Sequence, residues 1–115
     1  MKVMCTSDVK GYVPSGHQRT VNKRLIDEAA GARNITLVFG TIDPGGGAHE
    51  HVHDVEQVYY VLSGKATIVT PRKKCEAGPG SAIFIPPNTP HKISNSGTKQ
   101  LQILVIHSPH SKRIS

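Results

Sequence analysis

Short runs rich in valine and isoleucine alternate along this chain with clusters of glycine, proline and asparagine. β-Branched residues favour extended strands, whereas the residues between them favour tight turns, as in the DPGGG segment at 43–47. Strands are therefore expected at residues 33–42, 57–62, 65–70, 81–85 and 101–107, with a short one after His91. Strands of this length at this spacing predict an all-β domain, a sandwich or small barrel, and argue against a helical bundle.

The 115 residues suffice for one domain with one hydrophobic core. Residues 33–108 are expected to form the barrel, between an extended arm at 1–32 and a polar, basic tail at 109–115. Within the arm, residues 22–30 are a candidate for a short helix, and Gly31 would end it because glycine readily adopts the left-handed conformation of a helix C-terminus.

No segment of the chain has the apolar length of a membrane span, and the first ten residues lack the apolar core of a signal peptide. We therefore expect a cytoplasmic protein with no membrane partner. Cys5 and Cys75 have neither zinc-ligand nor redox-motif spacing. This predicts two free, reduced thiols in that compartment, with a bridge between them as the alternative.

The formal net charge of +6 raises nucleic acid as a class of partner. However, the lysines and arginines are scattered, and no aromatic residues interleave with them to stack on bases. We therefore expect no nucleic-acid partner. The positive field suits a small acidic substrate instead, and Arg33 at the start of the first barrel strand is a candidate to neutralise it.

Seven histidines are present, and two of them form the pattern His51-Val52-His53. In a strand, residues i and i+2 project to the same face, so both imidazoles point the same way, with backbones about 6–7 Å apart. That separation suits one metal ion. Gln57 lies four residues further on, about 13 Å away in a straight strand, and reaches the same centre only if residues 54–56 bend.

These residues belong to two motifs that resemble the cupin family. The first motif, G-x5-H-x-H-x3-E-x6-G, is matched with every spacing kept by Gly45, His51, His53, Gln57 and Gly64. The second, G-x5-P-x-G-x2-H-x3-N, is matched by Gly80, Pro86, Asn88, His91 and Asn95. Glutamine replaces the usual glutamate in the first. Asn88 replaces a glycine in the second, a tolerable change because asparagine also accepts left-handed backbone angles.

The resemblance implies a small antiparallel β-barrel, the cupin jelly-roll, and one divalent metal ion per chain. It implies that the metal ligands are His51, His53, Gln57 and His91. Three imidazoles and an amide are all neutral, so the ion keeps its full charge, acts as a stronger Lewis acid and favours an anionic ligand. Nitrogen and oxygen ligands together suit Fe, Mn, Ni, Co, Cu or Zn.

Catalysis at such a site would also need a general base, for which the candidates are Tyr59, His49 and His107. Tyr59 shares the strand face of Gln57, His49 precedes the first motif at the barrel mouth, and His107 closes the last strand. Glu56 is a rival carboxylate ligand, but its opposite parity in the strand predicts that it faces away.

The resemblance implies a metal-dependent enzyme acting on a small, oxygen-bearing and anionic organic molecule, as a dioxygenase, isomerase, decarboxylase or lyase. The alternative is a cupin that binds a sugar or effector without turnover. We also expect a homodimer, because apolar residues of the arm can add strands to the sheet edge of a partner, among them Val13 and Val21.

Overall fold

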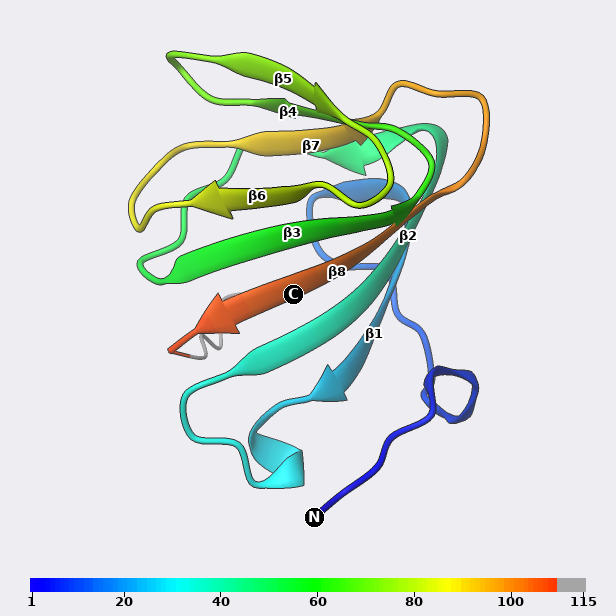
Figure 1. Cartoon of the computed structure of the whole chain (residues 1–115), viewed down its shortest axis with the longest axis vertical. Coiled ribbons are helices and arrows are strands. Elements are labelled where there is room, and N and C mark those ends of the chain that lie inside the picture. The colour runs from blue at the N-terminus through cyan, green and yellow to red at the C-terminus, as the bar shows by residue number, and fades with distance from the viewer. Residues whose placement is uncertain (110–115) are drawn as a thin grey trace.

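The computed structural model describes residues 1–109, whose regular elements are strands and two single 3-10 turns (Figure 1). The turns are η1 (Thr6–Asp8) and η2 (Glu28–Ala30). The strands are β1 (His17–Ile26), β2 (Thr36–Ala48), β3 (Glu56–Ser63), β4 (Ala66–Val69), β5 (Lys74–Ala77), β6 (Ala82–Ile85), β7 (Lys92–Asn95) and β8 (Leu101–Ser108). The predicted all-β fold class is confirmed.

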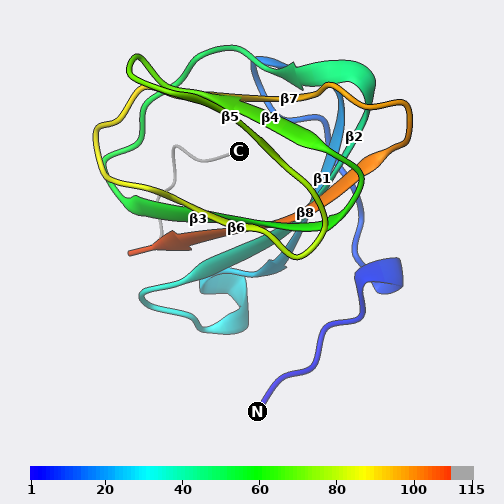
Figure 2. The same ribbon diagram turned by 45° about the horizontal axis from the view of Figure 1, so that its top comes forward.

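All strand pairs are antiparallel, in the order β5-β4-β7-β2-β8-β3-β6. β1 pairs with β2 between Leu37 and Ala48, along the edge of β2 opposite to β8. The sheet curls on itself, so that β4, β5 and β7 face β3, β6 and β8 in two layers (Figure 2). This is the predicted antiparallel barrel. Its two layers bury their inner faces against each other and leave their outer faces to solvent.

The predicted turn at 43–47 is wrong, because β2 runs through these residues to Ala48. At Ile42 the strand pairs with Leu101 of β8, and at Gly47 it pairs with Ser94 of β7. A Cβ on Gly47 would lie 2.4 Å from the carbonyl oxygen of Ile93, so only glycine allows this approach. The glycines therefore let a single strand cross from one layer to the other through a bulge.

The predicted helix at 22–30 is also wrong, because residues 22–26 belong to β1, which pairs with β2. Only η2 is helical; the Asp27 carboxylate accepts a hydrogen bond from the Ala29 amide at 3.0 Å. Gly31 ends η2 with φ 94°, as expected. The weak helical preference of this segment is overridden by the backbone hydrogen bonds available along the edge of β2.

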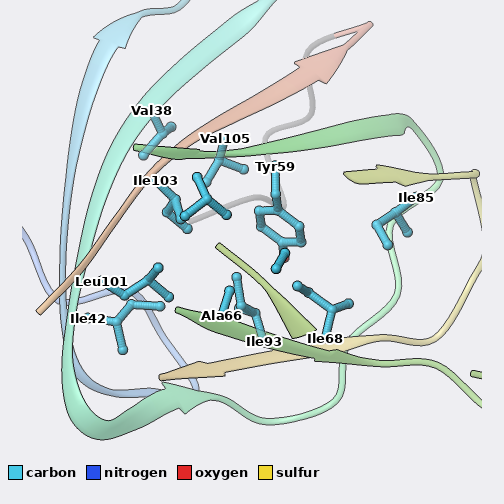
Figure 3. Close-up of a cluster of buried hydrophobic side chains, with 12 residues drawn as sticks. Val38, Ile42, Tyr59, Ala66, Ile68, Ile85, Ile93, Leu101, Ile103 and Val105 are labelled. Carbon is cyan, nitrogen blue, oxygen red and sulfur yellow. The ribbon is translucent and has the colours of Figure 1, made fainter. Parts of the chain in front are cut away.

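The hydrophobic core lies between the two layers, and most of the long strands contribute every second residue to it. Figure 3 shows Val38, Ile103 and Val105 pointing from one layer toward Ile68 and Ile93 of the other. Every second residue of β8 is buried, which places the last of them, His107, inside with the apolar residues.

No helix among residues 1–109 is long and apolar enough to cross a membrane. Cys5 is exposed and Cys75 half-buried, and both are free thiols. The tail predicted at 109–115 lies outside the described residues from position 110 onward.

Candidate metal centre

Three histidines meet at one end of the barrel. The potential ligand atoms of His51, His53 and His91 all lie within 4.8 Å of one another. The ring centroid of His51 is 4.8 Å from that of His53 and 4.4 Å from that of His91. A cluster this tight can hold one divalent ion, as the sequence motifs imply.

Backbone hydrogen bonds between two loops bring these histidines together. His51 and His91 form an isolated β-bridge, in which the amide of each donates to the carbonyl of the other, at 2.9 and 3.0 Å. The Asn88 amide donates to the carbonyl of His53 at 2.7 Å. Asn88 has φ 60°, the left-handed conformation expected of a residue that replaces glycine. The loop before β3 and the loop before β7 are thus pinned to each other.

The second ring nitrogens set the orientation of two imidazoles. Nδ1 of His51 donates to the carbonyl of His49 at 2.8 Å, and Nδ1 of His91 donates to the carbonyl of Thr89 at 2.8 Å. A ring nitrogen that donates to a carbonyl carries the proton, so the lone pair of each neutral ring is on Nε2. Nε2 of His91 is buried and has no hydrogen-bond partner. This arrangement is typical of histidines that bind metal ions.

Gln57 begins the buried part of β3 and is only 2% exposed. The chain bends at Asp54 and Val55, so the straight-strand separation from His53 does not apply. The Oε1 atom of Gln57 is buried without a hydrogen-bond partner, and the side chain lines the same cavity as His51 and His53. Its free amide oxygen and the histidine Nε2 atoms form a nitrogen-and-oxygen donor set that fits a borderline divalent ion.

The cavity beside this cluster has a volume of about 250 Å³. Its walls are mostly apolar, with Val38, Ile103 and Val105 among the lining residues. Tyr59 is 3% exposed, and its ring centroid lies 6.2 Å from that of His91. Burial holds the pKa of the Tyr59 hydroxyl well above its usual range, so this phenol stays protonated and suits hydrogen-bond donation rather than proton removal.

His107 lies on the inner face of β8, 1% exposed, and its ring centroid is 5.6 Å from that of His53. Neither of its ring nitrogens has a hydrogen-bond partner. Burial, reinforced by the neighbouring His53, lowers the pKa of His107 to about 3, so its imidazole is neutral.

Other predicted residues lie at the margin of the site. His49 is an exposed side chain at the edge of the cavity, and its backbone carbonyl holds His51. Glu56 is exposed, as its strand parity predicts. Arg33 is exposed, precedes β2 and does not line the cavity.

The sequence patterns gave no reason to place β1 at the site, yet three of its residues line the cavity, namely His17, Thr20 and Asn22. The ring centroid of His17 is 5.9 Å from that of His51, and its Nδ1 bonds the Ser15 carbonyl at 2.9 Å. Burial lowers the pKa of His17. A single histidine outside any motif carries no signal of its own, since only the pairing of β1 with β2 brings it near His51.

Comparisons with solved structures match nearly all of the chain to a known fold. The polyketide cyclase RemF from Streptomyces resistomycificus is 32% identical, with a TM-score of 0.87 over 96% of this chain and 80% of that one. A predicted oxalate decarboxylase from Thermotoga maritima is 21% identical, with a TM-score of 0.84 over 95% of this chain and 100% of that one. The second likeness shows the fold alone.

Among curated proteins, an uncharacterised protein of Methanocaldococcus jannaschii is 41% identical over 61 residues, or 53% of this chain and 48% of that protein. Auxin-binding protein 1 of Arabidopsis thaliana is 33% identical over 87 residues, or 68% of this chain and 44% of that protein. The chain thus matches about half the length of these two relatives. The family model described as "Cupin domain" matches residues 38–107, which include both motif histidine groups. The chain therefore belongs to the cupin family.

Proposed function

We propose that this chain is a divalent-metal-dependent enzyme that acts on a small organic substrate through oxygen atoms of that substrate. The observation that carries the proposal is the cluster of His51, His53 and His91 beside a cavity with apolar walls. The Nδ1 contacts of His51 and His91 leave Nε2 lone pairs for an ion. Cupin membership and this site support an enzyme more directly than a storage protein.

The three histidines, with Gln57 as the fourth ligand, would hold the ion. When bound, a divalent ion supplies a Lewis acid that stabilises negative charge on a substrate oxygen, and neutral ligands leave that capacity undiminished. The cavity adds apolar side chains beside the ligands, and apolar surroundings strengthen electrostatic interactions at the site.

A molecule with neighbouring carbonyl groups is the substrate class that we propose. Such a molecule loses a proton to form an enolate, an anion of the kind that an uncompensated metal charge favours. The 32% identity to a polyketide cyclase, across nearly all of this chain, supports this class. The apolar residues Val38, Ile103 and Val105 suit the carbon skeleton of such a molecule.

Proton removal requires a base in the same cavity. Tyr59 is held protonated and is suited to donating a hydrogen bond to a substrate oxygen. Basic atoms at the mouth come from His49 and Glu50, which line the cavity next to His51. We propose that the proton leaves the substrate toward this mouth, where solvent can carry it away.

Elemental analysis of protein purified without a histidine tag tests the metal, with His51→Ala as the control. About one ion per chain that the control lacks is expected. The loaded protein is then mixed with a panel of β-diketones, including acetylacetone, and absorbance is followed. Equal metal content in wild type and His51→Ala contradicts the proposal. So does a wild type that holds no metal even after reconstitution. A diketone that stabilises the fold but is recovered unchanged would favour a binding cupin instead.

We also propose that the chain forms a homodimer. The surface that we propose for it is not the arm at 1–32 but the outer face of the sheet. The outward positions of β2, β8, β3 and β6 form an outer apolar face, made of Leu37, Phe39, Val58, Tyr60, Leu62, Phe84, Leu104 and Ile106. Tyr60, Leu62 and Phe84 are 38%, 41% and 54% exposed. A contiguous apolar face of this kind is typical of a protein interface. Val21 lies in β1, paired with this chain's own β2.

A further inference from the structure

One row of inward residues crosses the sheet at the end of the barrel that carries the metal cluster. Thr36 of β2 pairs with His107 of β8, which pairs in turn with Gln57 of β3. All three are buried, at 6%, 1% and 2% exposure. Two residues further along each strand, the next inward row holds Val38, Val105 and Tyr59. A polar row and a mostly apolar row therefore lie side by side on the inner face of the sheet.

Buried atoms without hydrogen-bond partners are rare in folded proteins and call for an explanation. Among the described residues, the buried side-chain nitrogen and oxygen atoms without a partner are Oε1 of Gln57, Nε2 of His91 and both ring nitrogens of His107. A metal ion would account for the first two, which belong to the proposed ligands. It would not account for His107, which is not one of the three histidines whose ligand atoms cluster within 4.8 Å.

His107 nevertheless lines the cavity and contacts the ring of His53. An imidazole always carries at least one N–H donor, and in its uncharged form the other ring nitrogen is a bare acceptor. A hydroxyl or enol group can accept a hydrogen bond from the first or donate one to the second, whereas a ketone or carboxylate can only accept. A hydroxyl can therefore pair with either ring nitrogen of His107.

We propose that His107 is a substrate-binding residue, which holds a hydroxyl or enol group of the substrate apart from the oxygens at the metal. This inference rests on the proposed function and adds a specificity element to it. The substrate would carry at least two polar ends. One lies at the histidine cluster and one at His107, and the apolar wall contacts the flat or unsaturated body between them.

Binding of simple aromatic chelators tests this role without any turnover. The probe is salicylate, and the comparison set is the dihydroxybenzoates that add one hydroxyl to salicylate. Zinc-loaded wild type, His107→Phe and His107→Gln are compared by calorimetry, after the zinc affinity of each has been measured with zinc alone. His107→Gln keeps a donor and an acceptor, and thermal unfolding of each variant shows that it is folded.

We expect zinc and salicylate affinities of both variants to stay within about threefold of wild type. At least one dihydroxybenzoate should bind wild type about tenfold tighter than salicylate, because a buried polar group left unpaired disfavours the analogue that lacks the hydroxyl. His107→Phe should lose this preference and His107→Gln should retain part of it.

Three outcomes overturn the inference, and they are distinguishable. A loss of zinc affinity in both variants would make His107 a metal ligand. A second outcome is that zinc binds normally but wild type shows no preference for a dihydroxybenzoate over salicylate, or His107→Phe keeps that preference unchanged. Either result would remove the role of His107 and leave the proposed function standing. Failure of wild type to bind zinc, iron, manganese, nickel, cobalt or copper would overturn the proposed function and this inference together.

Discussion

At the scale of single residues, Gln57 is where this chain departs from the acidic ligand of its family motif. The side chain is almost fully buried, and its amide oxygen has no hydrogen-bond partner within the described chain. An amide donates less strongly to a divalent ion than a carboxylate does and compensates none of its charge. The choice of ligand at this one position therefore balances metal affinity against Lewis acidity.

Replacing Gln57 with Glu should raise metal affinity by about tenfold, because the carboxylate offsets the charge of the ion. The metal-free variant should be less stable than wild type by about 1–3 kcal/mol, because it buries an unpaired acid. Competition with a chromophoric chelator measures the first effect and urea unfolding the second. Glu56→Gln, at an exposed position next to it, is the matched control and should change neither. Unchanged affinity in Gln57→Glu would exclude residue 57 as a ligand.

Asn88 acts through its backbone. It has φ 60°, and its amide holds the carbonyl of His53. Asn88→Ala should destabilise the fold by about 1 kcal/mol, because a Cβ without a compensating polar group disfavours the left-handed conformation. Asn88→Gly should be close to neutral. Equal unfolding midpoints for the alanine and glycine variants in urea would show that the left-handed backbone conformation does not determine which residue is favoured at position 88.

At the scale of elements, β2 is the strand that joins the two layers, and its glycine-rich bulge makes this possible. The backbone of Gly47 passes against the backbone of β7 so closely that no side chain fits between them. β1 follows the same bulge, since its register passes from Thr20 opposite Ile42 to Gln18 opposite Gly47. The bulge therefore also determines which β1 side chains reach the cavity.

Gly47→Ala should destabilise the protein by more than about 2 kcal/mol, because a methyl group would collide with the backbone of Ile93 and Ser94. Gly78→Ala is the control, since a Cβ there meets no heavy atom within 4 Å. Chemical denaturation of both variants measures the difference. Similar stability of the two would mean that β2 and β7 separate at little cost.

At the scale of the whole molecule, the two faces of the β2-β8-β3-β6 layer have different chemistry. The inner face carries the core and the site, while the outer apolar face leaves Tyr60, Leu62 and Phe84 exposed within the described chain. A layer with apolar residues on both faces is expected where a second copy covers the outer one.

Light scattering at micromolar concentration should give twice the chain mass of 12.4 kDa. The double variant Tyr60→Lys with Phe84→Lys should shift the protein to monomer, because unpaired charges would be buried in the interface. Lys92→Glu changes an exposed residue in the opposite layer and should leave the dimer intact. A wild type that remains at the mass of one chain would contradict the homodimer.

Features that depend on local spacing could be predicted from the sequence. Strand character follows from β-branched runs, and the shared face of His51 and His53 follows from the two-residue period of a strand. The left-handed conformation of Asn88 and the end of η2 at Gly31 follow from the conformational range of single residues. None of these requires knowledge of a distant partner.

Features that depend on pairing between distant segments were decided by the tertiary structure. The glycines at 43–47 are typical of a turn, and only β7 on one side and β1 on the other make them part of a strand. In the same way, His17 reaches the site because β1 pairs with β2. His107 joins Thr36 and Gln57 because three strands align in one register. Register is set by the summed burial and hydrogen bonding of whole strands, and no local pattern contains that sum.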